Sequence, residues 1–176
     1  ISEKKAVELA RSFGQNQPPK GITEEEWEEY SQKLQARYED VLGWALYQYG
    51  KSEQAMKYLK KAVTVMPQSS TYYHYGTALL QQRGAEVQYK MQQPDSGKKS
   101  ITVTEGIEKA LEYLAGAVAF GGEKGDQAYD VLQSVWIKTG RDTTELSSFI
   151  EKQTKRVEQE YKKRIQIGRA SCRERV

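Results

Sequence analysis

Residues 36–69 read ARYEDVLGWALYQYGKSEQAMKYLKKAVTVMPQS, and this stretch decides the fold of the chain. Gly50 divides it into two segments whose apolar residues recur at the three- and four-residue spacings of a helix. Ser52 is a suitable N-cap for the second segment, which we expect to be helical over residues 53–66. Pro67 ends that helix, because proline has no amide hydrogen to donate. The stretch therefore predicts two helices joined by a tight turn.

The first of these helices is expected to begin well before residue 36. Thr23 is followed three residues later by Glu26, which is the pattern of a capping box. The acidic run from Glu24 to Glu26 also suits the positive end of a helix dipole. From there to Tyr49 the chain has no proline and one glycine, Gly43. We expect one long helix, or a helix broken once.

Four further helices are expected downstream, and glycines mark where they stop. Gly84 is expected to end the first, Gly121 and Gly122 the second, and Gly140 the third. GGEKG at 121–125 is interpreted as a linker, and Thr143 or Thr144 as the cap of the last helix. Residues 91–104 are interpreted as a loop, with a short extended stretch at 101–104 (ITVT). The expected helices are 70–82, 105–120, 126–139 and about 143–166.

The spacing of these features indicates a repeat. Gly50 and Gly84 are 34 residues apart, while Gly84 and Gly140 are 56 apart, which is one more such unit with about 22 residues inserted. The second helices of the first two units share one spacing of small and large residues, seen in Ala55, Leu59 and Ala62 and again in Ala110, Leu114 and Ala117.

A 34-residue pair of helices with small residues where they cross resembles the tetratricopeptide repeat (TPR). The chain looks like a fragment of a bacterial-type member of that family. The resemblance is clearest over 36–69, although Glu39 stands where that family usually has Trp. It implies an all-α, TPR-like α-solenoid of about three helix-turn-helix pairs, one with the insertion, plus a leading helix. The positions that carry the repeat pattern are Leu42, Gly43, Gly50, Ala55, Leu59, Ala62, Pro67, Gly76, Ala110, Leu114 and Ala117.

The expected organisation places a leading helix and a proline-rich linker in residues 1–21. Ala6, Leu9, Ala10 and Phe13 have helical spacing there, and the interval from Ala6 to Pro18 equals that from Ala55 to Pro67, so this segment fits a truncated earlier repeat. Residues 22–166 form the repeat domain. Its parts are 36–69, 69–122 with the insertion 85–105, and 126–166, a degenerate third repeat with a long terminal helix.

The last ten residues, 167–176 (IGRASCRERV), break the patterns before them. They resemble the in-frame translation of a sequencing adapter, so we interpret them as an artefact rather than a basic tail, and expect the natural chain to continue beyond residue 166. They carry three Arg and one Glu, a net charge of +2, and the only cysteine, Cys172. Because the whole chain has a net charge of +3, the preceding 166 residues have +1 and no cysteine.

Composition excludes several classes of function. The small net charge does not predict nucleic acid as a partner. One Cys and one His are too few for a disulfide framework or a Cys/His metal cage. Without an apolar run of about 18 residues, no membrane span is predicted. We therefore predict no catalytic residue, cofactor or metal site, and the sequence does not indicate a compartment.

His74 and the tyrosines around it are the most distinctive side chains. His74 suits a general base or a pH-sensitive contact, but we favour a partly exposed packing or groove residue. In TPR-like arrays the first helix of each pair lines a concave groove. The residues that the resemblance places there, for a protein or peptide partner, are Arg37, Asp40, Trp44, Tyr47, Gln48, Tyr73, Thr77, Gln81, Asp130, Ser134 and Lys138.

These features favour a scaffold for protein–protein interaction. One alternative is an accessory helical domain of a truncated bacterial redoxin with a thioredoxin fold, because the charged final helix resembles the connector in such proteins. Another is a structural oligomerisation module. The oligomeric state itself is not predicted.

Overall fold

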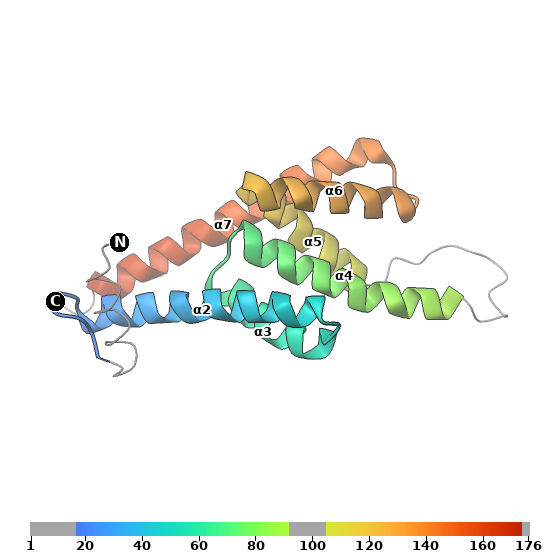
Figure 1. Cartoon of the computed structure of the whole chain (residues 1–176). Helices are drawn as coiled ribbons and strands as arrows, with labels where there is room; N and C mark the ends of the chain where they lie inside the picture. The colour runs from blue at the N-terminus through green and yellow to red at the C-terminus, as the bar shows by residue number, and fades with distance from the viewer. Residues whose placement is uncertain (1–16, 92–104, 174–176) are drawn as a thin grey trace.

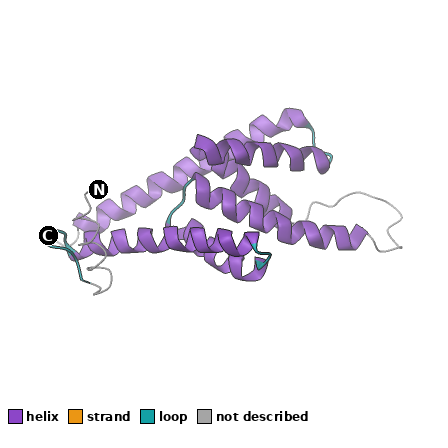
Figure 2. Cartoon of the chain, viewed as in Figure 1, coloured by secondary structure: helices purple, strands orange, loops and turns teal. Residues whose placement is uncertain are grey.

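A computed structural model describes residues 17–91 and 105–173, and within these ranges the chain is all-α, without a strand (Figures 1 and 2). This confirms the predicted fold class. Two expected features lie outside the described residues. They are the part of the leading segment 1–21 that precedes residue 17, where the helix was expected, and the extended stretch at 101–104. The helices are α2 (Glu24–Gln48), α3 (Ser52–Val65), α4 (Ser69–Met91), α5 (Glu105–Phe120), α6 (Gly122–Lys138) and α7 (Leu146–Arg173), with a 3-10 turn η1 (Thr143–Glu145) before α7.

The first four described helices pack as two consecutive pairs that stack on one another, whereas α6 and α7 pack mainly on α5 rather than on each other. α2 packs on α3 and α4 packs on α5 (Figure 1). Between pairs, α4 also packs against α3, α6 against α5, and α7 against α5. Each first helix after α2 thus lies against the second helix of the pair before it. This arrangement is consistent with an all-α helical repeat.

Two glycines set how closely the paired helices approach. A Cβ on Gly43 of α2 would lie 2.7 Å from Leu59 Cγ of α3, and a Cβ on Gly76 of α4 would lie 3.2 Å from Leu114 Cγ of α5. The same glycine–leucine contact therefore recurs in the first two pairs. Helix α2 passes Gly43 unbroken, so the alternative of a break there is wrong.

The first and third pairs are closed by the same turn. Gly50 and Gly140 have φ angles of 74° and 73°, a region that glycine adopts without steric cost. The Gly50 amide donates to the Tyr47 carbonyl at 2.9 Å, and the Gly140 amide donates to the Ile137 carbonyl at 3.0 Å. The amides of Lys51 and Arg141 then donate five residues back. Both turns are Schellman motifs, and the glycines predicted to end these helices occupy the position that has a positive φ.

Gly84 does not form the corresponding turn, and the predicted helix end there is wrong. α4 continues through Gly84 to Met91, so the first part of the expected insertion 85–105 is helical. A glycine inside a helix costs about 1 kcal/mol relative to alanine. The residues that follow it, AEVQYKM, are mostly good helix formers and offset that cost.

The capping box of α2 is confirmed, but other predicted helix ends are wrong. Thr23 and Glu26 exchange the two hydrogen bonds of the box. Ser52 lies inside α3, whose N-cap is Lys51 without a side-chain bond. α6 begins at Gly122, so most of GGEKG is helix rather than linker. Asp142, rather than Thr143 or Thr144, caps the start of η1 by accepting the Thr144 amide at 2.9 Å.

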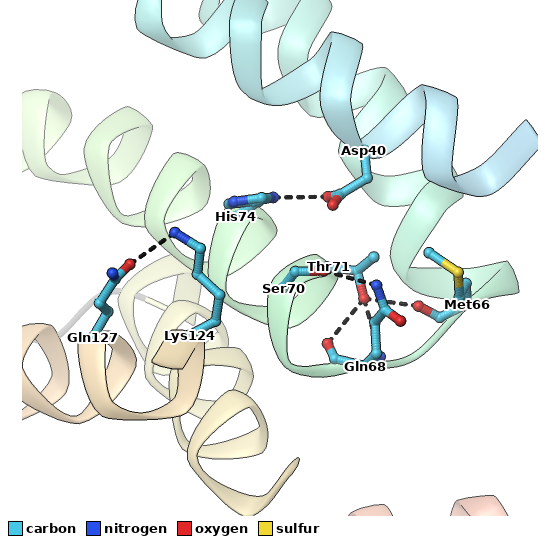
Figure 3. A network of polar contacts seen from close by, with 8 residues as sticks. All are labelled: Asp40, Met66, Gln68, Ser70, Thr71, His74, Lys124 and Gln127. Carbon is cyan, nitrogen blue, oxygen red and sulfur yellow. Dashed lines mark hydrogen bonds and ion pairs between the residues drawn. The ribbon is translucent and has the colours of Figure 1, made fainter. Parts of the chain in front are cut away.

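The connection from α3 to α4 is held by a buried threonine. Pro67 lies between the two helices, as predicted. The Thr71 hydroxyl, which is 0% exposed, donates to the Met66 carbonyl at 2.8 Å and accepts the Gln68 amide at 3.1 Å (Figure 3). The turn that Pro67 begins is therefore closed by one hydroxyl.

The alanines and leucines of the repeat pattern form the core. The six that lie on α3 and α5 are 0% exposed: Ala55, Leu59, Ala62, Ala110, Leu114 and Ala117. Leu59 packs in one cluster with Tyr75 and Ala78 of α4, and Leu114 packs in another with Ala128 and Leu132 of α6. Each second helix thus contacts the first helix of the next pair through these positions.

Candidate functional site

A buried hydrogen bond between a histidine and an aspartate joins the first helices of the first two pairs. His74 Nδ1 of α4 lies 2.9 Å from Asp40 Oδ1 of α2 (Figure 3). Asp40 is 5% exposed and His74 is 8% exposed. The expectation of a partly exposed His74 is therefore wrong, and Asp40 lies inside the contact between two helices rather than free on a surface.

An aromatic cluster covers this pair. The Trp44 ring stacks on the His74 imidazole, with centroids 4.3 Å apart, and on the Tyr47 ring at 4.9 Å. The Tyr73 ring is tilted against Trp44 at 5.9 Å. Trp44, Tyr47 and Tyr73 are half-buried. We refer to Trp44, Tyr47, Tyr73 and His74 as the aromatic cluster.

The environment of the cluster disfavours ionisation of the Tyr47 phenol. Burial raises the pKa of Tyr47, and the neighbouring Tyr73 raises it further. The Tyr47 hydroxyl therefore stays protonated at neutral pH, where it offers a hydrogen-bond donor beside the aromatic rings.

Helix α6 extends the site to the third pair. Lys124 Nζ lies 5.1 Å from the centroid of the Tyr73 ring, which is within cation–π distance. The same ammonium donates to Gln127 Oε1 at 2.8 Å (Figure 3). The cluster is therefore continuous across α2, α4 and α6, the first helices of the three pairs.

The predicted groove residues divide into three sets. Asp40, Trp44, Tyr47 and Tyr73 are brought together as described. Thr77 is half-buried one turn beyond Tyr73, and its hydroxyl has no hydrogen-bond partner in the described part of the chain. The remaining six are exposed on α2, α4 and α6 and are not joined to the cluster by the contacts above: Arg37, Gln48, Gln81, Asp130, Ser134 and Lys138.

Sequence reasoning missed Lys124, Gln127 and the role of His74. Asp40 and His74 are 34 residues apart, one more than the 33 that separate Gly43 from Gly76. They therefore lie at adjacent positions of the repeat on successive first helices. Lys124 was missed because it lies in GGEKG, which was interpreted as a linker.

The cavities lined by described residues lie elsewhere. One of about 390 Å³ opens between α2 and α3, where Glu39 meets Lys57 and Lys61. Another of about 180 Å³ lies among α4, α5 and α7, beside Tyr113 and Arg156. In residues 17–91 and 105–173, no three His, Cys, Asp or Glu side chains are grouped as metal ligands would be.

The described helices also include none that combines the length and apolar character needed to cross a membrane. Comparisons of the chain with protein-family models, with curated proteins and with solved structures found no match.

Proposed function

We propose that the chain is a TPR-like scaffold that binds a peptide segment of a partner protein on the face formed by α2, α4 and α6. The aromatic cluster is the observation that carries this proposal. Tryptophan and tyrosine are enriched among the residues that dominate binding energy at protein interfaces. Here they lie together on α2 and α4, with Lys124 of α6 beside them, and they remain half-exposed.

The support beneath the cluster favours binding. Trp44 is held between His74 and Tyr47, and His74 is itself fixed by Asp40. Side chains that are already ordered lose little conformational entropy when a partner binds, which raises affinity without new contacts.

The charges around the cluster favour a mixed rather than a strongly acidic segment. Arg37 of α2 and Lys124 and Lys138 of α6 supply positive charge, but Asp130 lies between the two lysines in the sequence of α6. This is not the dense Lys and Arg clamp expected for an acidic tail. A segment with an apolar anchor and a few polar groups suits the face best.

Selection from a displayed library of random 12-residue peptides tests the proposal. The full chain is the bait, and the Trp44→Ala, Tyr73→Ala double variant is the counter-selection. Tyr49→Ala is the matched control, because Tyr49 is an aromatic side chain of the α2 terminus that is 84% exposed. Circular dichroism of each variant checks that it is folded.

We expect enriched peptides whose binding weakens at least 30-fold in the double variant, since loss of an interface hot spot costs about 2 kcal/mol or more. Binding to Tyr49→Ala should stay within threefold of the unmodified chain. If peptides bind the double variant as well as they bind the unmodified chain, the assigned face is wrong. Failure to enrich any peptide contradicts peptide binding itself.

A further inference from the structure

The cavity between α2 and α3 lies where the next pair of helices has aromatic rings. It has a volume of about 390 Å³, which is within the size range of small-molecule sites. Ala36 and Glu39 of α2 and Val65 of α3 are among the residues that line it. We call it the α2–α3 cavity.

The glycine–leucine contact that recurs in the first two pairs lets their positions be compared. From Gly43 to Gly76 the offset between α2 and α4 is 33 residues, and from Leu59 to Leu114 the offset between α3 and α5 is 55 residues. Residues that are related by these offsets therefore occupy equivalent places in the two pairs.

Two residues that line the cavity have aromatic counterparts in the second pair. Glu39 corresponds to Tyr72, and Val65 corresponds to Phe120. The rings of Tyr72 and Phe120 meet edge to face, with centroids 5.3 Å apart, and the Tyr72 ring leaves no room for a Cβ on Gly116. These rings fill the space between α4 and α5. In the first pair a carboxylate and a smaller aliphatic side chain stand in their place, which leaves the cavity open.

Three lysines make the mouth of the cavity positive. Lys57, Lys60 and Lys61 of α3 line it, and all three are exposed. Lys61 corresponds to Gly116, but its side chain is 66% exposed and its Nζ lies 3.7 Å from Oε1 of the buried Glu39. Within residues 17–91 and 105–173, Lys57 and Lys60 have no ion-pair partner. Two positive charges therefore stand beside the open space without a counter-charge from the described part of the chain.

We propose that the α2–α3 cavity binds a small aromatic carboxylate, with its ring beside Ala36 and Val65 and its anionic group on Lys57 and Lys60. The ring supplies the apolar surface that Tyr72 and Phe120 supply in the second pair, and its burial removes that surface from water. The lysine ammonium groups donate charge-assisted hydrogen bonds to the carboxylate. The cavity is separate from the aromatic cluster, so this proposal does not depend on the proposed function.

A titration of the full chain with phenylpropionate tests the site. This probe joins the ring of a phenylalanine side chain to a carboxylate. Amide chemical shifts follow the titration, because they report both the Kd and the residues that the probe contacts. We expect a Kd of about 1 mM, which is ordinary for a ligand of this size, and shifts concentrated at residues 36–39 and 57–65.

Two matched probes separate the ring from the charge. Phenylpropionamide has the same ring without the charge, and butyrate has the charge without the ring. Each should bind at least fivefold more weakly than phenylpropionate. Butyrate that binds as tightly would show an adventitious anion on the lysines, and an amide that binds as tightly would show that the lysines do not recognise the carboxylate. Either result overturns the proposal.

Val65→Phe places in the first pair the ring that Phe120 supplies in the second. Val65 is 43% exposed near the end of α3, and circular dichroism checks that the variant is folded. Phenylpropionate should bind it at least tenfold more weakly, because the new ring occupies the cavity. Val41→Phe is the matched control, since Val41 is 69% exposed and does not line the cavity. Equal Kd values for the two variants would overturn the site.

The Lys57→Gln, Lys60→Gln double variant tests the charges. Binding of phenylpropionate should weaken at least fivefold, while binding of phenylpropionamide stays within twofold. Lys33→Gln is the control, because it removes an exposed lysine of α2 that pairs with Glu29 instead of lining the cavity. Equal weakening in the double variant and the control would contradict the site, as would an unmodified chain whose shifts near the cavity do not saturate.

Discussion

The contact of Gly43 with Leu59 makes a quantitative prediction about the first pair of helices. In Gly43→Ala, the new Cβ would lie 2.7 Å from Leu59 Cγ and 3.1 Å from the Leu59 backbone nitrogen. The helices must therefore move apart or Leu59 must change rotamer. Overpacking of this kind costs about 1–3 kcal/mol. Replacing a helical glycine by alanine recovers about 1 kcal/mol of that, so we expect a net loss of about 0–2 kcal/mol.

The decisive measurement is the coupling between the two positions. Leu59→Ala alone should cost about 2–5 kcal/mol, because Leu59 is 0% exposed and its removal leaves a cavity. In the double variant the clash with the Leu59 side chain disappears, only the 3.1 Å approach to the backbone nitrogen of residue 59 remains, and the added methyl group fills part of that cavity. The loss should therefore be smaller than the sum of the two single losses by about 1–3 kcal/mol. Urea unfolding followed by circular dichroism measures all three values.

Gly50→Ala is the control for this cycle. Gly50 has a φ of 74°, so alanine is strained there, but its Cβ would have no atom within 4 Å. Its effect should therefore add to that of Leu59→Ala within about 0.5 kcal/mol. If Gly43→Ala is equally additive with Leu59→Ala, the close approach of α2 and α3 is not what selects glycine at position 43.

Three further predictions concern polar groups at helix ends. Hydrogen bonds from the Thr23 and Thr144 amides lower the pKa of Glu26 and of Asp142. The stabilisation from these bonds is therefore present above the ordinary carboxyl pKa and is lost as pH falls through the folded-state pKa. In urea unfolding, the free energy of unfolding should fall less between pH 7 and pH 3 for Glu26→Gln than for the unmodified chain. Thr71→Val leaves the buried turn after Pro67 without its hydroxyl and should cost about 1–3 kcal/mol in urea unfolding, whereas no loss would contradict the role of this bond. Trp136→Phe removes the donor that lies 2.8 Å from the Asp142 carbonyl, and a fall in the free energy of unfolding of about 1 kcal/mol is expected, with an unchanged value as the contrary result.

The parts of the fold that follow from local chemistry could be predicted from the sequence. Thr23 and Glu26 form the expected capping box, and Gly50 and Gly140 form the expected turns. These features depend on residues a few positions apart, so the sequence contains all the information that they need. The end of α4 was missed because Gly84 was judged by the spacing to Gly50, while the helix formers after it decide the local conformation.

The candidate site could be predicted only in part, because it is made by contacts between helices. Trp44 and Tyr73 were expected on one face from the resemblance to the tetratricopeptide repeat. The burial of His74 was not, since it depends on how far α4 lies from α2 and on the Trp44 ring above it. Local pattern identifies the face of a helix, but the depth of a side chain depends on the neighbouring helix.

The Asp40–His74 pair also contributes to the alignment of the first two pairs of helices. Alanines and leucines spaced one turn apart would pack nearly as well after the helices slid by one turn, about 5.4 Å. Such a slide would separate His74 from Asp40 and leave a buried carboxylate without its partner, which costs several kcal/mol. The pair therefore acts together with the Thr71–Met66 hydrogen bond in fixing this alignment, and the aromatic rings above it stack at the positions that the alignment sets.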